Sequence, residues 1–264
     1  MTHYKLALLG FGNVGQAFAQ LLTRKKETIK NQYGISYAIT GIATGSHGVA
    51  LNPAGIDTDT ALALMAEGNS LDSLSSQPAP KNNLDFIQTC DADVLFENTP
   101  VSYHDGQPAL DHIRQALNKG MYAITANKGP VVHGFQELSA LAAQKGKKFY
   151  FESTVMDGAP IFSMFRELPA AQLTKITGVL NSTTNLMLSR MEDGESFDQA
   201  VAHAQAVGIA ETDPSGDVDG WDAAIKLAAL VSVLMGISLK PDQIKRSGIR
   251  DITPAQIAEA KSQG

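Results

Sequence analysis

The sequence predicts an α/β fold: an N-terminal Rossmann-type, doubly wound parallel sheet followed by a second α+β domain. Short apolar segments alternate with helical patterns through the first half of the 264-residue chain, as in β-α-β units. A glycine-rich turn follows the first apolar segment. After about Tyr150 this alternation stops. We therefore expect two domains, residues 1–130 and residues 131–264, a number that the chain length allows.

In the first domain, strands are predicted where apolar runs are short and bounded by polar turns. These runs are Tyr4–Leu9, Ile35–Ala43, Ala92–Phe96 and Tyr122–Thr125. Apolar residues at helical spacing predict helices at Val14–Thr23, Thr60–Glu67, Asp105–Asn118 and Phe135–Gln144. Residues 68–83 are rich in Ser, Pro and Asn and should form an exposed loop.

In the second domain, one segment has the pattern of a strand, Leu173–Leu180. Three segments have the pattern of helices: Asn185–Glu192, Phe197–Val207 and Asp219–Met235. This mixture is typical of an α+β unit.

The composition excludes several classes of protein. Asp and Glu (27) outnumber Lys and Arg (21), and a chain of net charge −6 without basic clusters is not expected to bind nucleic acid or an anionic membrane. No apolar run approaches the length of a membrane span, and the N-terminus lacks the basic leader of a signal peptide. The single cysteine, Cys90, excludes a disulfide framework and fits a cytoplasmic protein.

The glycine-rich turn has the spacing G-x-G-x-x-G, with Gly10, Gly12 and Gly15 between the first strand and the first helix. The first glycine allows a tight turn, the second lets the backbone approach a pyrophosphate, and the third lets helix and strand pack closely. The phosphates would rest on the helix N-terminus. This context favours a dinucleotide site over a glycine-rich turn without a ligand.

The end of the second predicted strand bears on the choice of dinucleotide. Residues 42–47 read IATGSH, without the Asp or Glu that usually binds the adenosine ribose. Small polar residues leave room for a 2′-phosphate but supply no arginine to pair with it. We therefore expect NAD or NADP, with a slight preference for NADP.

Lys128 follows a predicted strand and is itself followed by glycine and proline. In an open α/β sheet, ligands bind at the carboxyl edge of the strands. A lysine there can reach a carboxylate or the cofactor, although an ordinary exposed lysine fits the spacing equally well.

Lys226 is the only charged residue between Ala223 and Ile237, and it lies four positions after Asp222. This spacing places the two side chains on one helix face, within contact. A lysine on an apolar face needs an anionic partner or a shifted pKa, and both occur at catalytic sites. The alternative is a lysine that extends outward into water. The acidic residues around it lack the loop spacing of a calcium site.

Cysteine and histidine bear on which kinds of catalysis are not expected. Cys90 has no nearby histidine, and the six histidines are scattered, so neither thiol nor zinc chemistry is expected. Residues 152–160 form an irregular Gly/Pro turn whose carbonyls are able to line a small cation site, although a plain turn is equally consistent.

Taken together, the motifs resemble the homoserine dehydrogenase family over most of the chain, from Tyr4 to about Arg250. The matches, in the family's order, are GFGNVG at 10–15, ENT at 97–99, TANKGP at 125–130, ESTVMDGAP at 152–160, GVLNSTTNLML at 178–188 and AETDPSGDVDGWDAAIKL at 210–227. The resemblance implies an NAD(P)-binding first domain and a second domain for substrate binding, catalysis and dimerisation.

The resemblance also implies an activity: NAD(P)-dependent interconversion of L-homoserine and L-aspartate 4-semialdehyde, on the route to threonine and methionine. Lys226 matches the proton donor, with Lys128 and Asp222 also at the reaction centre. Glu211 and Asp222 match residues that hold the amino-acid substrate. Which group holds the substrate carboxylate stays open between Thr183, Thr184 and a lysine.

Further positions match the family's cofactor and cation ligands. The cofactor contacts are expected at Gly10, Phe11, Gly12, Asn13, Val14, Gly15, Thr99, Lys128 and Gly208. A monovalent cation, usually sodium, is expected at Glu152, Val155, Asp157 and Ala159, largely through backbone oxygens. The family's second domain forms an intersubunit sheet, so a homodimer is implied.

The sequence departs from the family pattern at Ser182, at the pair Met156–Asp157 in the cation loop and at Gly216. Family members also continue past the position of Gly264 with a segment that folds back on the nucleotide-binding domain; on this comparison the closing segment is absent. Two alternatives therefore stay open: a related dehydrogenase of another amino-acid-derived substrate, or a non-catalytic dinucleotide-binding paralogue or sensor.

Overall fold

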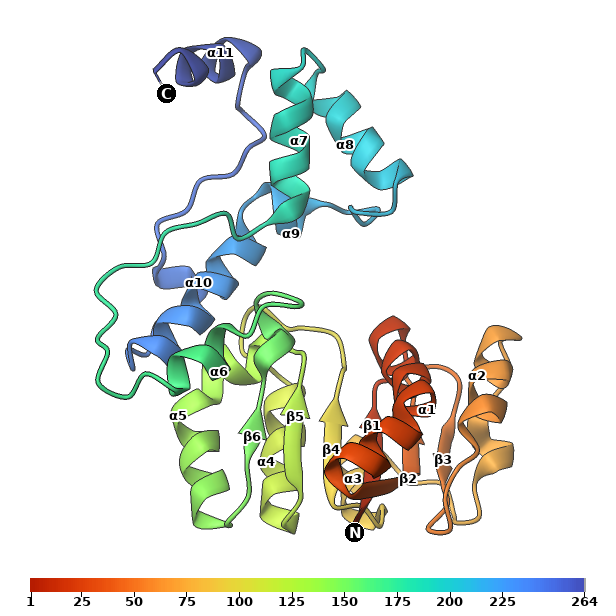
Figure 1. Cartoon of the computed structure of the whole chain (residues 1–264). Helices are drawn as coiled ribbons and strands as arrows, with labels where there is room; N and C mark the ends of the chain where they lie inside the picture. Colours follow the sequence, from red (N-terminus) through yellow and green to blue (C-terminus); the bar gives the residue numbers. More distant parts are fainter. Residues whose placement is uncertain (264) are drawn as a thin grey trace. The chain divides into compact units, whose positions relative to one another are not determined.

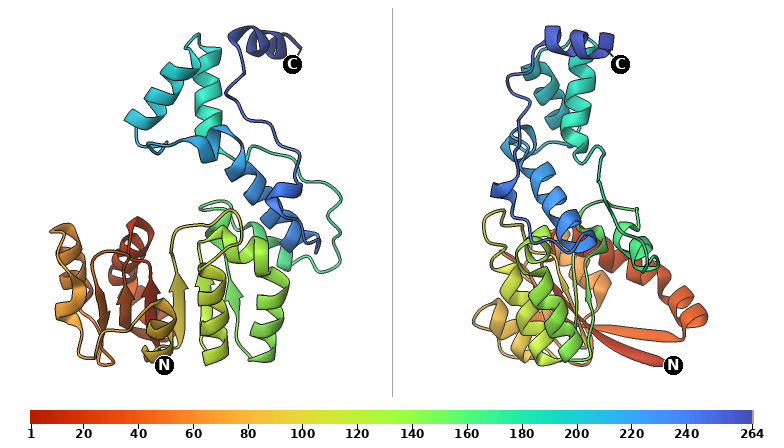
Figure 2. Two further views of the ribbon diagram at one scale, coloured as in Figure 1. Left: turned by 180° about the vertical axis from the view of Figure 1, so that it is seen from behind. Right: turned by 90° about the vertical axis from the view of Figure 1, so that its left-hand side faces the viewer.

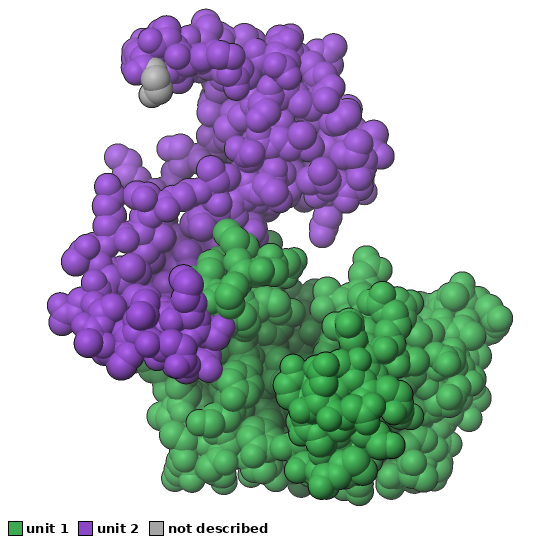
Figure 3. Space-filling model, viewed as in Figure 1, with its two compact units in different colours: residues 1–161 green, residues 162–264 purple. Residues whose placement is uncertain are grey.

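The computed structural model describes residues 1–263 and divides the chain into two compact units (Figures 1 and 3). Unit 1 is Met1–Ile161, and unit 2 begins at Phe162. The division lies later than the predicted boundary at residue 130. The reason is that α5 (Lys128–Gln144) and β6 (Phe149–Tyr150) complete the first sheet.

Unit 1 is built on one six-stranded sheet with the strand order β3-β2-β1-β4-β5-β6 (Figure 1). Every pair is parallel except β2–β3, which is antiparallel. The remaining strands are β1 (Thr2–Leu9), β2 (Ile35–Ala43), β3 (Val49–Leu51), β4 (Val94–Glu97) and β5 (Tyr122–Thr125). The strand order reverses between β1 and β4, and ligands of open α/β sheets bind beside the carboxyl ends at such a point.

Helices cover both faces of the sheet (Figure 2). They are α1 (Asn13–Tyr33), α2 (Thr58–Ala66), α3 (Asn83–Thr89), α4 (Ala109–Lys119) and α5, with short 3₁₀ turns at Leu71–Leu74 and Glu152–Thr154. Successive β1 residues alternate between the two cores: Leu6 and Leu8 pack in the core with Phe18 of α1, Ala7 and Leu9 in the core with Phe86 of α3. The predicted strands and helices of this unit are therefore present; two strands, Ile35–Ala43 and Tyr122–Thr125, have the predicted ends, and the other elements have shifted ends.

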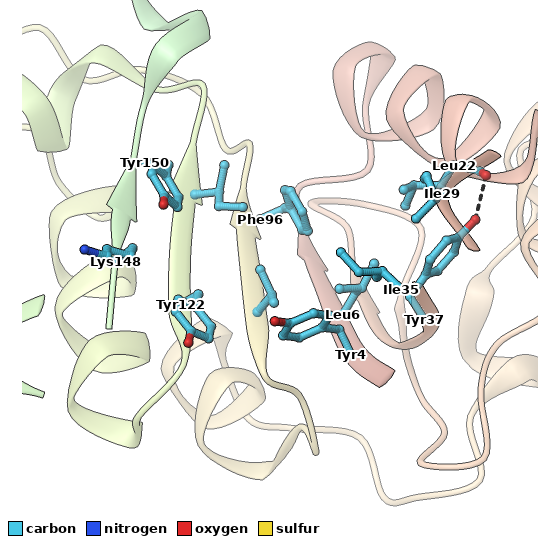
Figure 4. Close-up of a pocket in the computed structure, with 12 residues that line it drawn as sticks. Tyr4, Leu6, Leu22, Ile29, Ile35, Tyr37, Phe96, Tyr122, Lys148 and Tyr150 are labelled. Carbon is cyan, nitrogen blue, oxygen red and sulfur yellow. Dashed lines mark hydrogen bonds between the residues drawn. The ribbon is translucent and has the colours of Figure 1, made fainter. Parts of the chain in front are cut away.

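One face of the sheet carries an open hollow of about 500 Å³ (Figure 4). Its lining is mostly aromatic and aliphatic, from Tyr4, Leu6, Leu22, Ile29, Ile35, Tyr37, Val94, Phe96, Tyr122, Ile124, Lys148 and Tyr150. The hydroxyl of Tyr37 donates to the carbonyl of Leu22 at 2.6 Å. This lining contains no carboxylate and none of the predicted site residues, so the hollow is not the candidate site.

Within residues 162–263, the only regular secondary structure of unit 2 is helical, and irregular segments join the helices. Its elements are α6 (Ile161–Arg166), α7 (Ser182–Glu192), α8 (Phe197–Ala206), α9 (Ser215–Val218), α10 (Trp221–Leu234), a 3₁₀ turn at Pro241–Gln243 and α11 (Pro254–Gln263). The predicted strand Leu173–Leu180 is wrong. That segment runs without a strand partner in the described chain, and Val179 is 67% exposed. The core of the unit is formed by α7, α8 and α9, through Met187, Met191, Ala200, Ala204 and Val218.

Candidate functional site

The three glycines of the turn after β1 have different surroundings. A Cβ at Gly10, where φ is +91°, would lie 2.5 Å from the carbonyl oxygen of Asn98, and one at Gly15 would lie 2.5 Å from that of Gly10. These two glycines allow close backbone packing. A Cβ at Gly12 would meet nothing within 4 Å. Gly12 therefore keeps open the space in front of α1.

The N-terminus of α1 suits an anion. Gly12 is its N-cap and provides no side-chain acceptor, and the first turn carries no acidic residue. The amides of this turn lack a side-chain cap and carry the positive end of the helix dipole. Phe11 is 1% exposed and anchors the turn in the core, whereas Asn13 and Val14 are exposed. The turn therefore fits a pyrophosphate, which is the group that the glycine spacing predicts.

The loop after β2 is held by its own polar groups and by residues 70–72, where the amide of Leu71 donates to the carbonyl of His47 at 2.8 Å. The hydroxyl of Thr44 donates to the carbonyl of Gly48 at 2.9 Å and accepts from the amide of His47 at 2.7 Å. As the sequence indicates, residues 44–48 contain no carboxylate.

Glu97 ends β4 and is fully buried. Its Oε1 accepts from the amide of Thr99 at 3.0 Å and from the hydroxyl of Thr99. Its Oε2 accepts from the hydroxyl of Thr125 at 2.8 Å. A buried carboxylate therefore fixes Thr99, a predicted cofactor contact, to the ends of two strands.

Lys128 is the first residue of α5, directly after the N-cap Asn127. Asn127 is 5% exposed, and its side chain accepts from the amide of Gly129 at 2.9 Å while donating to the carbonyls of Thr99 and Pro100 at 3.0 and 3.1 Å. Lys128 is half-buried at the carboxyl edge of β5. The side chain of Asn127 thus links the start of α5, where Lys128 lies, to the loop that carries Thr99.

In unit 2, Lys226 and Asp222 lie one turn apart on α10 and form an ion pair, with Nζ 2.7 Å from Oδ2. Their side chains are 17% and 11% exposed. The lysine also donates to the carbonyl of Leu180 at 2.9 Å. The contact that the i, i+4 spacing predicts is therefore present, and the alternative of a lysine extended into water is wrong.

Asn181 joins this pair to a second carboxylate. It is the N-cap of α7, and its Nδ2 donates to Asp222 at 3.0 Å and to Asp217 at 2.6 Å. Its Oδ1 accepts from the amide and the hydroxyl of Thr184 at 2.7 and 2.9 Å. We call Asn181, Asp217, Asp222 and Lys226 the unit 2 polar cluster.

Other predicted residues of unit 2 lie outside this cluster. Glu211 is exposed, and its backbone carbonyl accepts from Gln205 Nε2 at 3.1 Å. Gly208 follows α8, where its φ of +74° favours glycine. Ser182 is exposed at the start of α7, and Thr183 is buried beside it. The contacts that Glu211 and Gly208 make in the structure do not by themselves indicate a functional role for either residue.

The predicted cation loop has mixed surroundings. Val155 is buried, Asp157 is exposed, and the carbonyl of Ala159 accepts from the amide of Ile161 at 2.9 Å. Glu152 begins a 3₁₀ turn. Within residues 1–263, no cluster of three or more His, Cys, Asp or Glu side chains has the geometry to hold a metal ion.

Cys90 is buried behind the sheet, and burial raises the pKa of its thiol to about 11. A thiol held neutral is a poor nucleophile, in agreement with the prediction that this chain does not use thiol chemistry. Among the described helices, none is both long enough and apolar enough to cross a membrane.

Comparison with known protein families identifies the family to which this chain belongs. Residues 10–152 match the family model of the NAD binding domain of homoserine dehydrogenase, and residues 160–264 match that of homoserine dehydrogenase itself. The chain belongs to the homoserine dehydrogenase family. Unit 1 thus carries the NAD-binding domain of a homoserine dehydrogenase, as the resemblance implies.

Individual relatives agree with this membership. The chain is 35% identical to the NAD(+)-dependent homoserine dehydrogenase of Pseudomonas canavaninivorans, covering 99% of this chain and 74% of the relative. It is 33% identical to the homoserine dehydrogenase of Methanocaldococcus jannaschii, covering 98% and 77%. A solved hyperthermophilic archaeal homoserine dehydrogenase in complex with NADPH has a TM-score of 0.81 at 29% identity, covering 95% of this chain and 75% of that one.

The sequence-based interpretation overlooked two residues of the site. Glu97 and Asn181 lie within motifs that the resemblance used, ENT and GVLNSTTNLML, but neither was assigned a role. The available signal was a polar residue at the end of an apolar segment, in each case two positions before a residue that was assigned or considered.

Proposed function

We propose that this protein interconverts L-homoserine and L-aspartate 4-semialdehyde by NAD(P)-dependent hydride transfer, with Lys226 as the proton donor. The observation that carries the proposal is the buried ion pair of Lys226 with Asp222, in a chain whose first unit belongs to an NAD-binding family. An ammonium kept on an apolar helix face by a carboxylate is suited to proton transfer.

The glycine turn and its surroundings suit the cofactor. Gly10, Gly12 and Gly15 with the N-terminus of α1 would hold the pyrophosphate, with Phe11, Asn13 and Val14 in the same turn. Thr99, Lys128 and Gly208 would complete the contacts. The nicotinamide of NAD(P)H supplies the hydride. We favour NADP slightly, because residues 44–48 contain no acidic residue of the kind that binds the adenosine ribose of NAD.

Lys226 would act on the substrate oxygen. Reduction of an aldehyde builds negative charge on its oxygen, and a nearby ammonium stabilises that charge and donates the proton. In the oxidation direction, the neutral amine of Lys226 accepts the proton from the hydroxyl. Asp222 orients the lysine in both directions, and we place Lys128 at the same reaction centre.

The two charged ends of the amino acid need fixed partners. We assign the α-ammonium to Glu211 and Asp222, since carboxylates pair with it directly. Thr183, Thr184 and a lysine are the candidates for the α-carboxylate.

A turnover assay tests the proposal. Oxidation of NADPH and of NADH is followed by absorbance with aspartate 4-semialdehyde, and then with other amino-acid-derived aldehydes. Turnover with aspartate 4-semialdehyde supports the assignment, and the ratio of kcat/KM for the two cofactors tests the preference for NADP. Turnover only with other aldehydes indicates a related dehydrogenase. Cofactor binding without any turnover indicates a sensor.

Two further properties belong to the proposal. A sodium ion at Glu152, Val155, Asp157 and Ala159 predicts that activity depends on the monovalent cation supplied. Homodimerisation is supported by the Leu173–Leu180 segment, which has the pattern of a strand but no strand partner in the described chain, and which is therefore suited to strand pairing with a second copy. Light scattering gives the molar mass of the wild type and of Val179→Lys, a change that places a charge in the segment. A monomeric wild type would contradict homodimerisation. We also propose a cytoplasmic location, because a chain with a single cysteine cannot form the internal disulfides that are common in oxidising compartments.

A further inference from the structure

Glu97 is a buried carboxylate that the proposed chemistry does not use. The rest of β4 is apolar, with Val94, Leu95 and Phe96 before it. Burying a carboxylate costs free energy unless its partners compensate, and apolar residues of similar volume are often as stable or more stable in such a place. The position of Glu97 therefore calls for a role beyond packing.

Every hydrogen bond to this carboxylate comes from a neutral donor. Oε1 accepts from the amide and the hydroxyl of Thr99, and Oε2 accepts from the hydroxyl of Thr125. His112, also buried, has its Nδ1 3.7 Å from Oε1, which is too far for a hydrogen bond. The carboxylate thus acts chiefly on two threonines.

The consequence for Thr99 is a fixed direction of its hydroxyl proton. A threonine hydroxyl has one proton to donate, and here the proton points at Glu97. The amide of Thr99 also donates to Glu97, and its carbonyl accepts from Asn127 Nδ2 at 3.0 Å. Thr99 is therefore held at three atoms, and its hydroxyl oxygen is left only as an acceptor toward a ligand.

Thr99 also lies beside the glycine turn. A Cβ placed on Gly10 would be 3.0 Å from the amide nitrogen of Thr99. This loop and the turn after β1 thus adjoin at the point where the strand order reverses, where a dinucleotide is expected.

We propose that Glu97 is a positioning residue that makes Thr99 an obligatory hydrogen-bond acceptor for an O–H or N–H group of the dinucleotide. The inference rests on the proposed function, because it assumes that unit 1 binds NAD(P). A neutral residue at position 97 that cannot accept a hydrogen bond leaves the Thr99 hydroxyl to turn, so that it no longer presents its oxygen to the cofactor.

The test measures NADPH binding to the full chain by fluorescence titration, without turnover. Glu97→Leu removes the acceptor and should weaken NADPH binding about tenfold, the effect of one hydrogen bond. Glu97→Gln keeps an amide oxygen for Thr99 and should restore the affinity to within about threefold. Thr99→Val should weaken binding about tenfold, and Thr99→Ser should restore it.

A double-mutant cycle shows whether Glu97 acts through Thr99. In the Thr99→Val background, Glu97→Leu should change the affinity less than about twofold, because the group it orients is already gone. The matched control is Thr40→Val, which removes another buried hydroxyl of unit 1, one that donates to the carbonyl of Asp91 at 2.8 Å. Urea unfolding of each variant reports its stability, and in turnover the loss should fall on the KM for NADPH rather than on kcat.

Each result bears on the inference. Additive effects of Glu97→Leu and Thr99→Val, or an effect of Glu97→Leu no larger than that of Thr40→Val, overturn it. If Glu97→Leu does not fold, Thr99→Val binding as well as wild type overturns it instead. A wild-type chain that binds neither NADPH nor NADH overturns the proposed function and this inference together, whereas tight wild-type binding with unaffected variants overturns the inference alone.

Discussion

Glu97 in unit 1 and Asp222 in unit 2 are both buried carboxylates, but their surroundings differ in kind. Glu97 accepts hydrogen bonds from the neutral hydroxyls of Thr99 and Thr125 and from one amide. Asp222 faces the ammonium of Lys226 at 2.7 Å and accepts from the amide of Asn181. Neutral donors fix the position of an oxygen, whereas an ammonium also carries a proton that can be transferred.

This difference separates two tasks between the units. The carboxylate of unit 1 is suited to hold a loop in one geometry beside the glycine turn. The unit 2 polar cluster is suited to hold a lysine in place, because Asp222 pairs with Lys226 and Asn181 in turn donates to Asp222. Cofactor binding and proton transfer should therefore respond to different mutations.

The largest effect should come from Lys226→Ala. Loss of the proton donor should lower kcat at least about 10²-fold, the lower end for general acid catalysis. NADPH affinity should stay within about twofold, because the turn that would bind the pyrophosphate lies in unit 1. Steady-state kinetics and fluorescence titration measure the two quantities. Lys226→Arg keeps the charge but is a poor proton donor, and it should also be slow. Near-normal turnover of either variant would remove Lys226 from this role.

The second prediction separates the glycines of unit 1. Gly12→Val should weaken NADPH binding more than about tenfold with little loss of stability, because its side chain enters open space that we propose the phosphates occupy. Gly15→Ala should instead lower the free energy of unfolding by about 1–3 kcal/mol, since its Cβ overlaps the carbonyl of Gly10. Titration and urea unfolding of both variants test this. Unchanged affinity in Gly12→Val would contradict the binding site.

The sequence predicted some elements of the fold more accurately than others. The strands Ile35–Ala43 and Tyr122–Thr125 were predicted with the bounds that the structure has, because both segments are rich in the β-branched and aromatic residues that favour strands. The first helix was predicted to end at Thr23 but continues to Tyr33, through a charged segment in which Ile29 is the only aliphatic residue. Leu173–Leu180 has the pattern of a strand, but the described chain offers it no partner.

The candidate site shows the same limit. The contact of Lys226 with Asp222 follows from four residues of one helix, so local spacing predicts it. Asn181 reaches Asp222 across 41 positions, and Glu97 reaches Thr125 across 28. Such pairs depend on how separate elements pack, which no local pattern in a single sequence specifies. Glu211 was assigned by resemblance alone, and its role stays a prediction.

The third prediction concerns the shared amide of the unit 2 polar cluster. Asn181→Asp keeps an oxygen to cap α7 but replaces the donor to Asp217 and Asp222 with a third carboxylate. We expect a loss of about 3 kcal/mol in the free energy of unfolding, from lost hydrogen bonds and repulsion between like charges. Urea unfolding at pH 7 measures it. Asn185→Asp, at an exposed position of α7, is the matched control and should cost much less. Equal losses would show that the bridging amide does not hold the cluster together.

The smallest effect tests Cys90, a buried group whose pKa is set mainly by burial and less by a charged neighbour. Burial raises the pKa of Cys90 from 9.0 to about 11, so the unfolded chain loses this proton first as pH rises. Between pH 9 and 11 the folded state binds more protons, and stability falls with rising pH. The loss should be about 2 kcal/mol across this window, and it should be absent below pH 9. Urea unfolding of wild type and Cys90→Ala over pH 7–11 measures it. Lys119, whose amine donates to the carbonyl of Ile87 at 2.9 Å, interacts electrostatically with Cys90, so the difference between the two profiles reports the thiol together with its effect on Lys119. Parallel pH profiles for the two proteins would mean that Cys90 ionises as readily in the sheet core as in water, and burial alone would then not keep a group of unit 1 neutral.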